Sequence, residues 1–151
     1  MMKIDSIKNY MGNENFETIS KDIFTFIKPL EKEYPDIENW FYNKQLKELN
    51  DRDILFIKDN DSIIGVVCLK KSENKICTFF IKENYRNKNL GTLLLNESIM
   101  ILDTKLPFMT IPENKVSSFK YFIDKYNWIL LDKKENNNHI IEYYYNGKYI
   151  K

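Results

Sequence analysis

The sequence predicts a mixed α/β fold of the α+β type, in which helices flank one mostly antiparallel sheet. Helical patterns and strand-like runs follow each other in the order helix, helix, three strands, helix, strand, helix, two strands. The composition, with 43% hydrophobic residues and 30% charged residues of nearly balanced sign, is typical of a folded globular protein. At a length of 151 residues, we expect a single domain that spans residues 1–151.

Two helices are expected before the sheet. Apolar residues at helical spacing predict the first of them: Ile19, Ile23, Phe24, Ile27 and Leu30. A second apolar face predicts the next helix, which should end at a polar turn over residues 50–53: Trp40, Phe41, Leu46 and Leu49.

Three strand-like runs follow at residues 54–58, 62–70 and 75–81. The breaks between them are short and polar, as hairpin turns usually are, so these strands should be antiparallel neighbours. A leucine-rich helix is then expected to reach Leu102. Beyond it we expect a strand at 107–111, a helix at 114–126, and a closing hairpin of strands 128–132 and 140–145.

The segment between the third strand and the leucine-rich helix, residues 85–92, has the features of a loop that binds phosphate. A strand that enters a helix through a tight loop leaves backbone N–H groups unpaired at the positive end of the helix dipole, and such an end binds anions. Successive amides surround phosphate oxygens best where the backbone tolerates positive φ. Gly91 and Asn89 meet this requirement. We call residues 85–92 the phosphate loop.

The phosphate loop also resembles a family motif. The pattern Arg86-x-x-Asn89-x-Gly91 is similar to the Arg/Gln-x-x-Gly-x-Gly/Ala segment of the GNAT superfamily, the N-acetyltransferases that use acetyl-CoA. The family usually has Tyr-Arg-Gly-Lys at this place, and this chain has Tyr85-Arg86-Asn87-Lys88. Asn89 replaces the first glycine of the motif, and Asn is among the residues that enter the left-handed region most readily.

The resemblance implies a fold and a way of binding the cofactor. The order of elements is that of the GNAT fold, in which the strands on either side of the cofactor-binding helix splay apart and the pantetheine arm lies in the opening. Amides of the phosphate loop would hold the pyrophosphate, and the backbone of the third strand would pair with pantetheine. The implied cofactor-binding residues are Phe79, Phe80, Ile81, Arg86, Asn87, Lys88, Asn89, Leu90, Gly91, Thr92 and Asn114. A backbone N–H near Phe80 or Ile81 is expected to stabilise the oxyanion.

Tyr121 is the candidate general acid that protonates the departing thiolate. The GNAT motif Asn-x-x-Ala-x-x-x-Tyr is matched in spacing by Asn114, Ser117 and Tyr121. The motif ends in Glu-Lys-x-Gly-Phe, which residues 124–128 resemble. Counting back from this ending places Ile123, two residues after Tyr121, at the position of the tyrosine. A packing role for Tyr121 is the alternative.

Glu113 is the candidate general base. An alkylamine is mostly protonated near neutral pH, so a base or a chain of ordered water must remove its proton before attack. Glu113 follows the strand at 107–111 and could face the opening. Alternatively, it complements the dipole of the next helix.

Composition argues against several other partners. A net charge of +1 gives no reason to expect nucleic acid or an anionic membrane, and no apolar stretch is long enough to span a bilayer, so a cytoplasmic location is expected. Cys68 and Cys77 have no metal-ligand spacing, and no metal is expected. The acidic segment at residues 31–38 could attract a cationic amine or could be a solvated helix turn.

The sequence therefore indicates transfer of an acetyl group from acetyl-CoA to a primary amine of a small molecule or peptide. The alternative within the same fold is a non-catalytic domain that binds acyl-CoA or regulates another protein. A third interpretation is an unrelated protein-interaction module, whose loop would bind no phosphate. A homodimer is a further expectation.

Overall fold

The computed structural model describes residues 2–86 and 89–147. The strands are β1 (Ile4–Ser6), β2 (Arg52–Asp59), β3 (Ser62–Lys70), β4 (Lys75–Ile81), β5 (Phe108–Pro112), β6 (Leu130–Glu135) and β7 (Ile141–Tyr145). The α-helices are α1 (Phe16–Ile27), α2 (Ile37–Trp40), α3 (Leu90–Leu102) and α4 (Lys120–Lys125). Shorter helical turns are η1 (Ile7–Tyr10), η2 (Lys28–Lys32), η3 (Phe41–Gln45), η4 (Lys71–Glu73), η5 (Glu83–Tyr85) and η6 (Glu113–Phe119).

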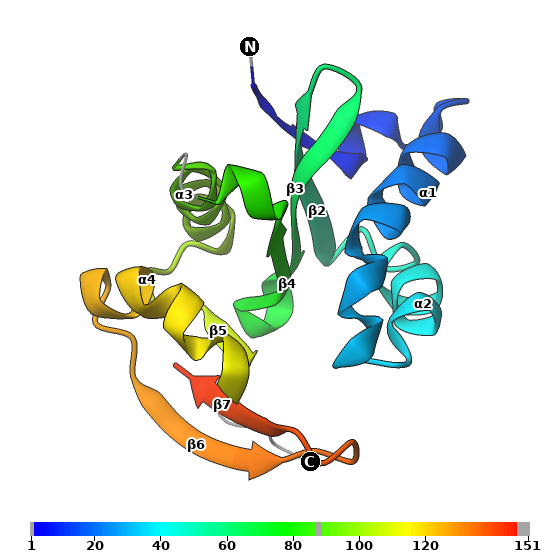
Figure 1. The fold of residues 1–151 in the computed structure, drawn as a ribbon. Helices are drawn as coiled ribbons and strands as arrows, with labels where there is room; N and C mark the ends of the chain where they lie inside the picture. Colours follow the sequence, from blue (N-terminus) through cyan, green and yellow to red (C-terminus); the bar gives the residue numbers. More distant parts are fainter. Residues whose placement is uncertain (1, 87–88, 148–151) are drawn as a thin grey trace.

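The strands of the described part of the chain form one seven-stranded sheet in the order β1-β2-β3-β4-β5-β7-β6. Every neighbouring pair is antiparallel except β4 and β5, which are parallel. Helices α1 and α2 cover one face of this sheet, and α3 and α4 lie on the other (Figure 1). The predicted mixed, mostly antiparallel sheet with flanking helices is thus confirmed.

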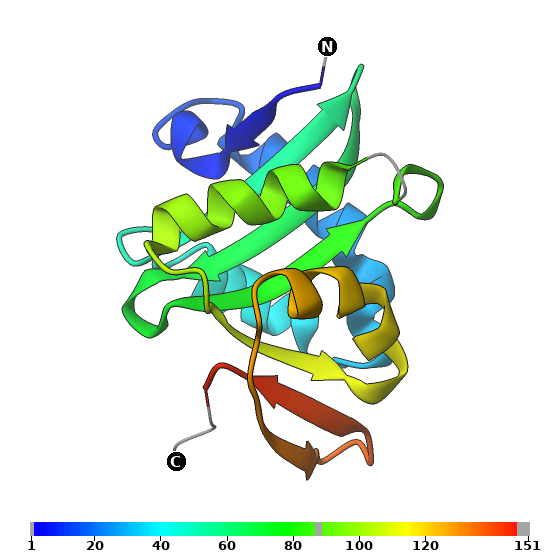
Figure 2. The same ribbon diagram turned by 90° about the vertical axis from the view of Figure 1, so that its left-hand side faces the viewer.

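Each face of the sheet has its own core, because alternate residues of a strand point to opposite faces. On the α3 side, Leu94 and Leu95 of α3 pack with Leu55, Ile57 and other residues of the central strands. On the α1 side, Ile23 and Phe41 pack with Phe56 of β2. Figure 2 shows α3 lying across the central strands, with η6 and α4 over the region of β5. Among the described residues, no helix is long and apolar enough to cross a membrane.

Strands β3 and β4 have the boundaries expected from the sequence, but β2 begins earlier. The predicted polar turn over residues 50–53 was wrong in its second half, because Arg52 and Asp53 lie in β2 and are only 6% exposed. Both side chains are satisfied by partners elsewhere in the fold. Ser6 donates a hydrogen bond of 2.7 Å to Asp53, and Arg52 Nε donates one of 3.0 Å to Glu48.

Three other elements differ from expectation. Strand β1 was missed, since its three residues are too few to show an alternating pattern. The helix expected over residues 114–126 is instead the 3₁₀ helix η6 followed by the short α4. Strand β6 extends to Glu135, so the closing turn is shorter than predicted.

Helix α3 approaches the sheet closely at Gly65 of β3. A Cβ atom at Gly65 would lie 3.1 Å from Cδ1 of Leu94, which is fully buried. This close approach helps to fix α3, and with it Asn89 and Leu90 at its start, relative to the sheet.

We expect Gly65→Val to lower the free energy of unfolding by about 1–3 kcal/mol, because the added methyl groups overpack the contact with Leu94. Urea unfolding would measure the change. Ser62→Val, at an exposed position of the same strand, is the matched control and should leave stability nearly unchanged. Equal stability of the Gly65 variant and the wild type would show that α3 does not depend on this close approach.

Candidate functional site

The site begins where β4 and β5 separate. In the described part of the chain, the two strands pair only at Lys75 with Phe108 and at Ile76 with Met109. Beyond Ile76 the last residues of β4 have no partner strand on this side. The splay implied by the resemblance is therefore present as an opening in the sheet.

A β-bulge in β4 lies at the start of this opening. On β3, Cys68 pairs with Thr78 and the next residue, Leu69, pairs with Ile76, so Cys77 is an extra residue in β4. A bulge bends its strand and changes the direction of the backbone groups that follow. Here it accompanies the departure of β4 from β5.

Alternation along β4 determines which backbone groups face the opening. Lys82 N–H donates to the carbonyl of Ile64 on β3 at 2.9 Å, and the carbonyl of Ile81 instead accepts a 3.0 Å bond from Arg86 Nε. Because neighbouring residues of a strand direct their backbone groups to opposite sides, Phe79 and Ile81 face the opening and Phe80 faces β3. Phe80 and Ile81 were the two candidate donors to the oxyanion. The alternation favours the N–H of Ile81 over that of Phe80, and it makes the N–H of Phe79 a further candidate.

The phosphate loop leads from this edge into α3. Asn89 precedes the helix with φ 62° and ψ 13°, the left-handed conformation expected for it, and Leu90 begins α3. The guanidinium of Arg86 lies 5.9 Å from the ring centroid of Phe80, so Arg86 holds the loop against the end of β4. The predicted residues Asn87 and Lys88 lie outside the described residues.

A cavity of about 490 Å³ lies between this loop, the end of β4 and the η6–α4 segment. We call it the loop cavity. Its lining residues are Phe79, Phe80, Ile81, Arg86, Asn89, Gly91, Thr92, Lys115, Ser118, Phe119, Tyr121 and Phe122. It therefore brings together most of the residues predicted to bind the cofactor. Leu90 is buried beneath the cavity as part of the core.

The 3₁₀ geometry of η6 decides which of its side chains face the loop cavity. Residues three apart lie over one another in such a helix, so Lys115 and Ser118 share one side. Asn114 and Ser117 share another side, where both are exposed, and neither lines the cavity. Asn114 was expected from an α-helical motif, and its cofactor-binding role stays a prediction.

Tyr121 lies at the rim of the loop cavity. Its side chain is 60% exposed, and its ring packs edge-on against Phe122 at 5.5 Å between centroids. The Lys125 ammonium lies 5.6 Å from the Tyr121 ring centroid. The Tyr121 side chain can therefore reach a ligand in the loop cavity. It is too exposed to serve only in packing the core.

Glu113 lies apart from the cavities. It is exposed at the start of η6, where its carboxylate accepts a hydrogen bond of 3.2 Å from the Tyr143 hydroxyl. The carboxylate does not line the loop cavity. Its assignment as general base stays a prediction.

A second cavity of about 490 Å³ lies on the side of the sheet covered by η2 and α2. We call it the α2 cavity. Apolar residues from both sides of the opening line it: Leu30, Ile37, Trp40, Phe79, Met109, Ile111 and Phe119. Phe79, Lys115 and Phe119 line both cavities, so the two meet at the separation of β4 and β5.

Lys115 at this junction is held by Glu33, with 3.4 Å between ammonium nitrogen and carboxylate oxygen. Asp36 is the only acidic residue of the segment 31–38 among those that line the α2 cavity. Nearby, the Tyr34 hydroxyl donates a 3.4 Å hydrogen bond to Glu142, and burial together with the Glu142 carboxylate raises the pKa of Tyr34 well above its usual value. Tyr34 is therefore a neutral phenol at physiological pH.

Sequence reasoning missed four residues that line the loop cavity: Lys115, Ser118, Phe119 and Phe122. They lie in the segment that carries the tyrosine motif, but that motif points to other positions. A three-residue spacing of Lys115, Ser118 and Tyr121 was the available signal, and it has meaning only once η6 is known to be a 3₁₀ helix.

Comparisons with known proteins agree with this geometry. The model of the acetyltransferase (GNAT) family matches residues 14–117. A comparison with curated protein sequences gives no match.

Solved structures support the fold at low sequence identity. A protein from Desulfovibrio desulfuricans, described as an acetyltransferase of the GNAT family, has a TM-score of 0.68 and 11% identity, covering 96% of this chain and 97% of its own. A GNAT-family acetyltransferase from Staphylococcus aureus has a TM-score of 0.62 and 16% identity, with coverage of 97% and 100%. The PaiA N-acetyltransferase from Thermoplasma acidophilum, solved with coenzyme A, has a TM-score of 0.59 and 16% identity, with coverage of 95% and 98%.

Substitutions at Asn89 test the phosphate loop. Asn89→Gly should preserve or tighten the affinity for CoA, since glycine adopts positive φ freely. Asn89→Val should weaken it by about tenfold, because a β-branched residue is strained there and the left-handed conformation costs L-residues about 1–2 kcal/mol. Calorimetric titration with CoA would measure both. Unchanged affinity of the Val variant would remove Asn89 from the binding loop.

Proposed function

Because this chain belongs to the GNAT acetyltransferase family, we propose that it transfers the acetyl group of acetyl-CoA to a primary amine of a small molecule or peptide by direct attack. The family match covers residues 14–117, which include β4, the phosphate loop and most of η6. The nature of the acceptor and the assignment of roles below are parts of this proposal.

One observation carries the proposal: two cavities on opposite sides of the sheet meet at the separation of β4 and β5. The loop cavity has the phosphate loop at one end and Phe79 at the other, and the α2 cavity also reaches Phe79. Such an arrangement lets a thioester and an amine approach one another from opposite sides without sharing a pocket. Direct attack requires this proximity and alignment of the reacting atoms.

The residues of the loop cavity fit acetyl-CoA. Backbone donors at the start of α3, with Asn89 in the left-handed conformation, suit a pyrophosphate, and the open edge at Phe79 and Ile81 suits the pantetheine amides. Acetyl-CoA supplies the activated acetyl group as a thioester. The coenzyme A bound by the Thermoplasma neighbour supports this choice of ligand.

The backbone N–H of Phe79 or Ile81 would stabilise the oxyanion that forms when the amine attacks. Both face the opening, as the alternation from Lys82 indicates. Removal of one such donor typically costs about 2.7–4 kcal/mol of transition-state stabilisation. The donor belongs to the main chain, so side-chain substitutions alone do not remove it.

Tyr121 would protonate the departing thiolate, and Glu113 would accept the proton of the amine. Tyr121 lines the loop cavity, which gives it access to the ligand. Glu113 is held by Tyr143 outside that cavity, so it would act through a chain of ordered water. The expected cytoplasmic location, single domain and homodimer belong to the same proposal.

A non-catalytic protein that binds acyl-CoA is the second candidate. The observation that favours it is the partial match around Tyr121, together with the distance of Glu113 from the cavities. Such a protein would keep the loop cavity and lack turnover.

Two measurements separate these functions. Calorimetric titration should show binding of both acetyl-CoA and CoA, since both carry the pyrophosphate and the pantetheine arm. Release of free thiol from acetyl-CoA should then depend on an added primary amine. Binding without amine-dependent thiol release would identify a non-catalytic protein, and absence of binding would contradict both functions.

We predict that Tyr121→Phe lowers kcat by at least about tenfold, because the hydroxyl that protonates the thiolate is lost. Cofactor affinity should change little, since the ring remains in place. Tyr126→Phe is the matched control: this tyrosine is on the turn after α4, donates to Asn96, and does not line the loop cavity. A Tyr121→Phe variant with wild-type kcat would exclude Tyr121 as the acid.

A further inference from the structure

The lining of the α2 cavity carries more positive than negative charge. Five basic residues line it: Lys44, Arg52, Lys70, Lys75 and Lys115. Among the described residues, only two acidic ones do so, Asp36 and Glu73. This balance is unexpected for a pocket that would receive a polyamine, because like charges repel.

Pairing within the structure shows which charges are left for a ligand. Lys70 forms an ion pair of 2.7 Å with Glu73, Arg52 forms one of 3.0 Å with Glu48, and Lys115 is held by Glu33 at 3.4 Å. Lys75 lies over the Phe108 ring, 5.1 Å from its centroid.

Neither Lys75 nor Lys44 has an acidic partner within 4.0 Å among the described residues. After Asp36 is counted against these two lysines, one positive charge remains. A carboxylate carries one negative charge and would balance it.

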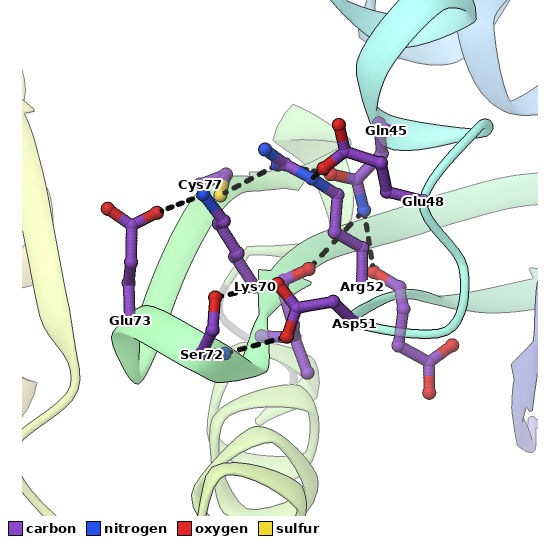
Figure 3. A network of polar contacts seen from close by, with 10 residues as sticks. Gln45, Glu48, Asp51, Arg52, Lys70, Ser72, Glu73 and Cys77 are labelled. Atoms are coloured by element: carbon purple, nitrogen blue, oxygen red, sulfur yellow. Dashed lines mark hydrogen bonds and ion pairs between the residues drawn. The ribbon is translucent and has the colours of Figure 1, made fainter.

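Arg52 is a preorganised donor at this end (Figure 3). Its side chain is 7% exposed, and Glu48 and Gln45 fix the guanidinium through Nε at 3.0 Å and Nη1 at 3.1 Å. Gln45 is itself fully buried and bound to the carbonyl of Asp53 at 2.9 Å. A guanidinium held in this way loses little freedom when it binds a carboxylate, and the second terminal nitrogen, Nη2, has no partner among these contacts.

The position of Arg52 sets the length of the acceptor. Arg52 Nη1 lies 3.8 Å from Cys77 Sγ, and Phe79 at the opening is two residues further along β4. Two residues of a regular strand span about 7 Å, so the bulge at Cys77 makes this an upper figure for the step from Cys77 to Phe79. An amine at the opening and an anionic group at Arg52 would therefore be about 7 Å apart, further than the two groups of an α-amino acid.

Building on the proposed function, we propose that the acceptor is a primary amine whose carbon chain ends in a carboxylate about 7 Å from the nitrogen, as in an ω-amino acid. The carboxylate binds at Arg52, with Lys75 and Lys44 nearby. The apolar walls of the α2 cavity contact the chain, and the amine lies at the separation of β4 and β5.

Matched acceptors test this proposal. 6-Aminohexanoate and hexylamine have the same chain and differ in the carboxylate, and five methylenes place nitrogen and carboxyl carbon about 7 Å apart. The kcat/KM for acetylation should be at least about tenfold higher for 6-aminohexanoate. Glycine, with the two groups adjacent, should show no such advantage. Equal or better acetylation of hexylamine would overturn the proposal.

Two variants link the preference to these residues. The ratio of kcat/KM for 6-aminohexanoate over hexylamine should fall in both variants. We expect a loss of about tenfold or more in Arg52→Gln and a severalfold loss in Lys75→Gln. Lys75 is only half-buried, so its variant provides a test even if the Arg52 variant does not fold. Lys71→Gln removes an exposed charge next to the cavity and is the control. An unchanged ratio in the Lys75 variant, and in the Arg52 variant if it folds, would overturn the proposal.

Binding of the acetylated products separates this inference from the proposed catalysis. Calorimetry in the presence of CoA should show tighter binding of N-acetyl-6-aminohexanoate than of N-hexylacetamide. If no amine is acetylated while this difference is found, the catalytic proposal fails and the ligand class stands. If amines are acetylated and the difference is absent, the ligand class fails and the catalytic proposal stands.

Discussion

The separation of β4 from β5 is the constraint on which the rest of the structure depends. A strand inside a sheet normally satisfies its backbone groups on both sides. After Ile76, β4 keeps β3 on one side, and no strand in the described part of the chain pairs with it on the other. Arg86 satisfies the carbonyl of Ile81. By the alternation along β4, the N–H groups of Phe79 and Ile81 point into the opening, where a ligand can reach them.

The flanking helices turn this opening into two cavities. Helix α3 is seated closely on β3 through Leu94 and Gly65, so the start of α3 has a fixed position relative to the sheet. The segment η6 covers the opening from the other side and contributes Lys115 and Phe119 to both cavities. The cofactor would thus be bound largely by main-chain groups, and the acceptor by side chains of the α2 cavity.

Much of this arrangement is predictable from local sequence. The bounds of β3 and β4 follow from apolar runs between polar turns, and the left-handed conformation of Asn89 follows from its place in the phosphate loop. These features depend on neighbours in the chain. The same reasoning placed a turn at Arg52 and Asp53, because their burial depends on Glu48, Gln45 and Ser6, whose positions only the fold determines.

The candidate site shows the same division. The phosphate loop is encoded in a short segment, and four of its described residues, Arg86, Asn89, Gly91 and Thr92, line one cavity. Asn114 was chosen as if residues 114–126 formed an α-helix, and the first half is a 3₁₀ helix with three residues per turn. The change of period directs Lys115 and Ser118 toward the cavity instead. The acceptor cavity joins η2, α2, β2, β4 and β5, and no local pattern in the sequence reveals that combination.

Amide hydrogen exchange at three consecutive residues of β4, measured by NMR with and without saturating CoA, tests the central claim most directly. Phe80 faces β3 and should be protected in both states. Phe79 and Ile81 face the opening and should exchange faster in the free protein and become protected when CoA pairs with this edge. Unchanged exchange at Phe79 and Ile81 with CoA bound would contradict the account.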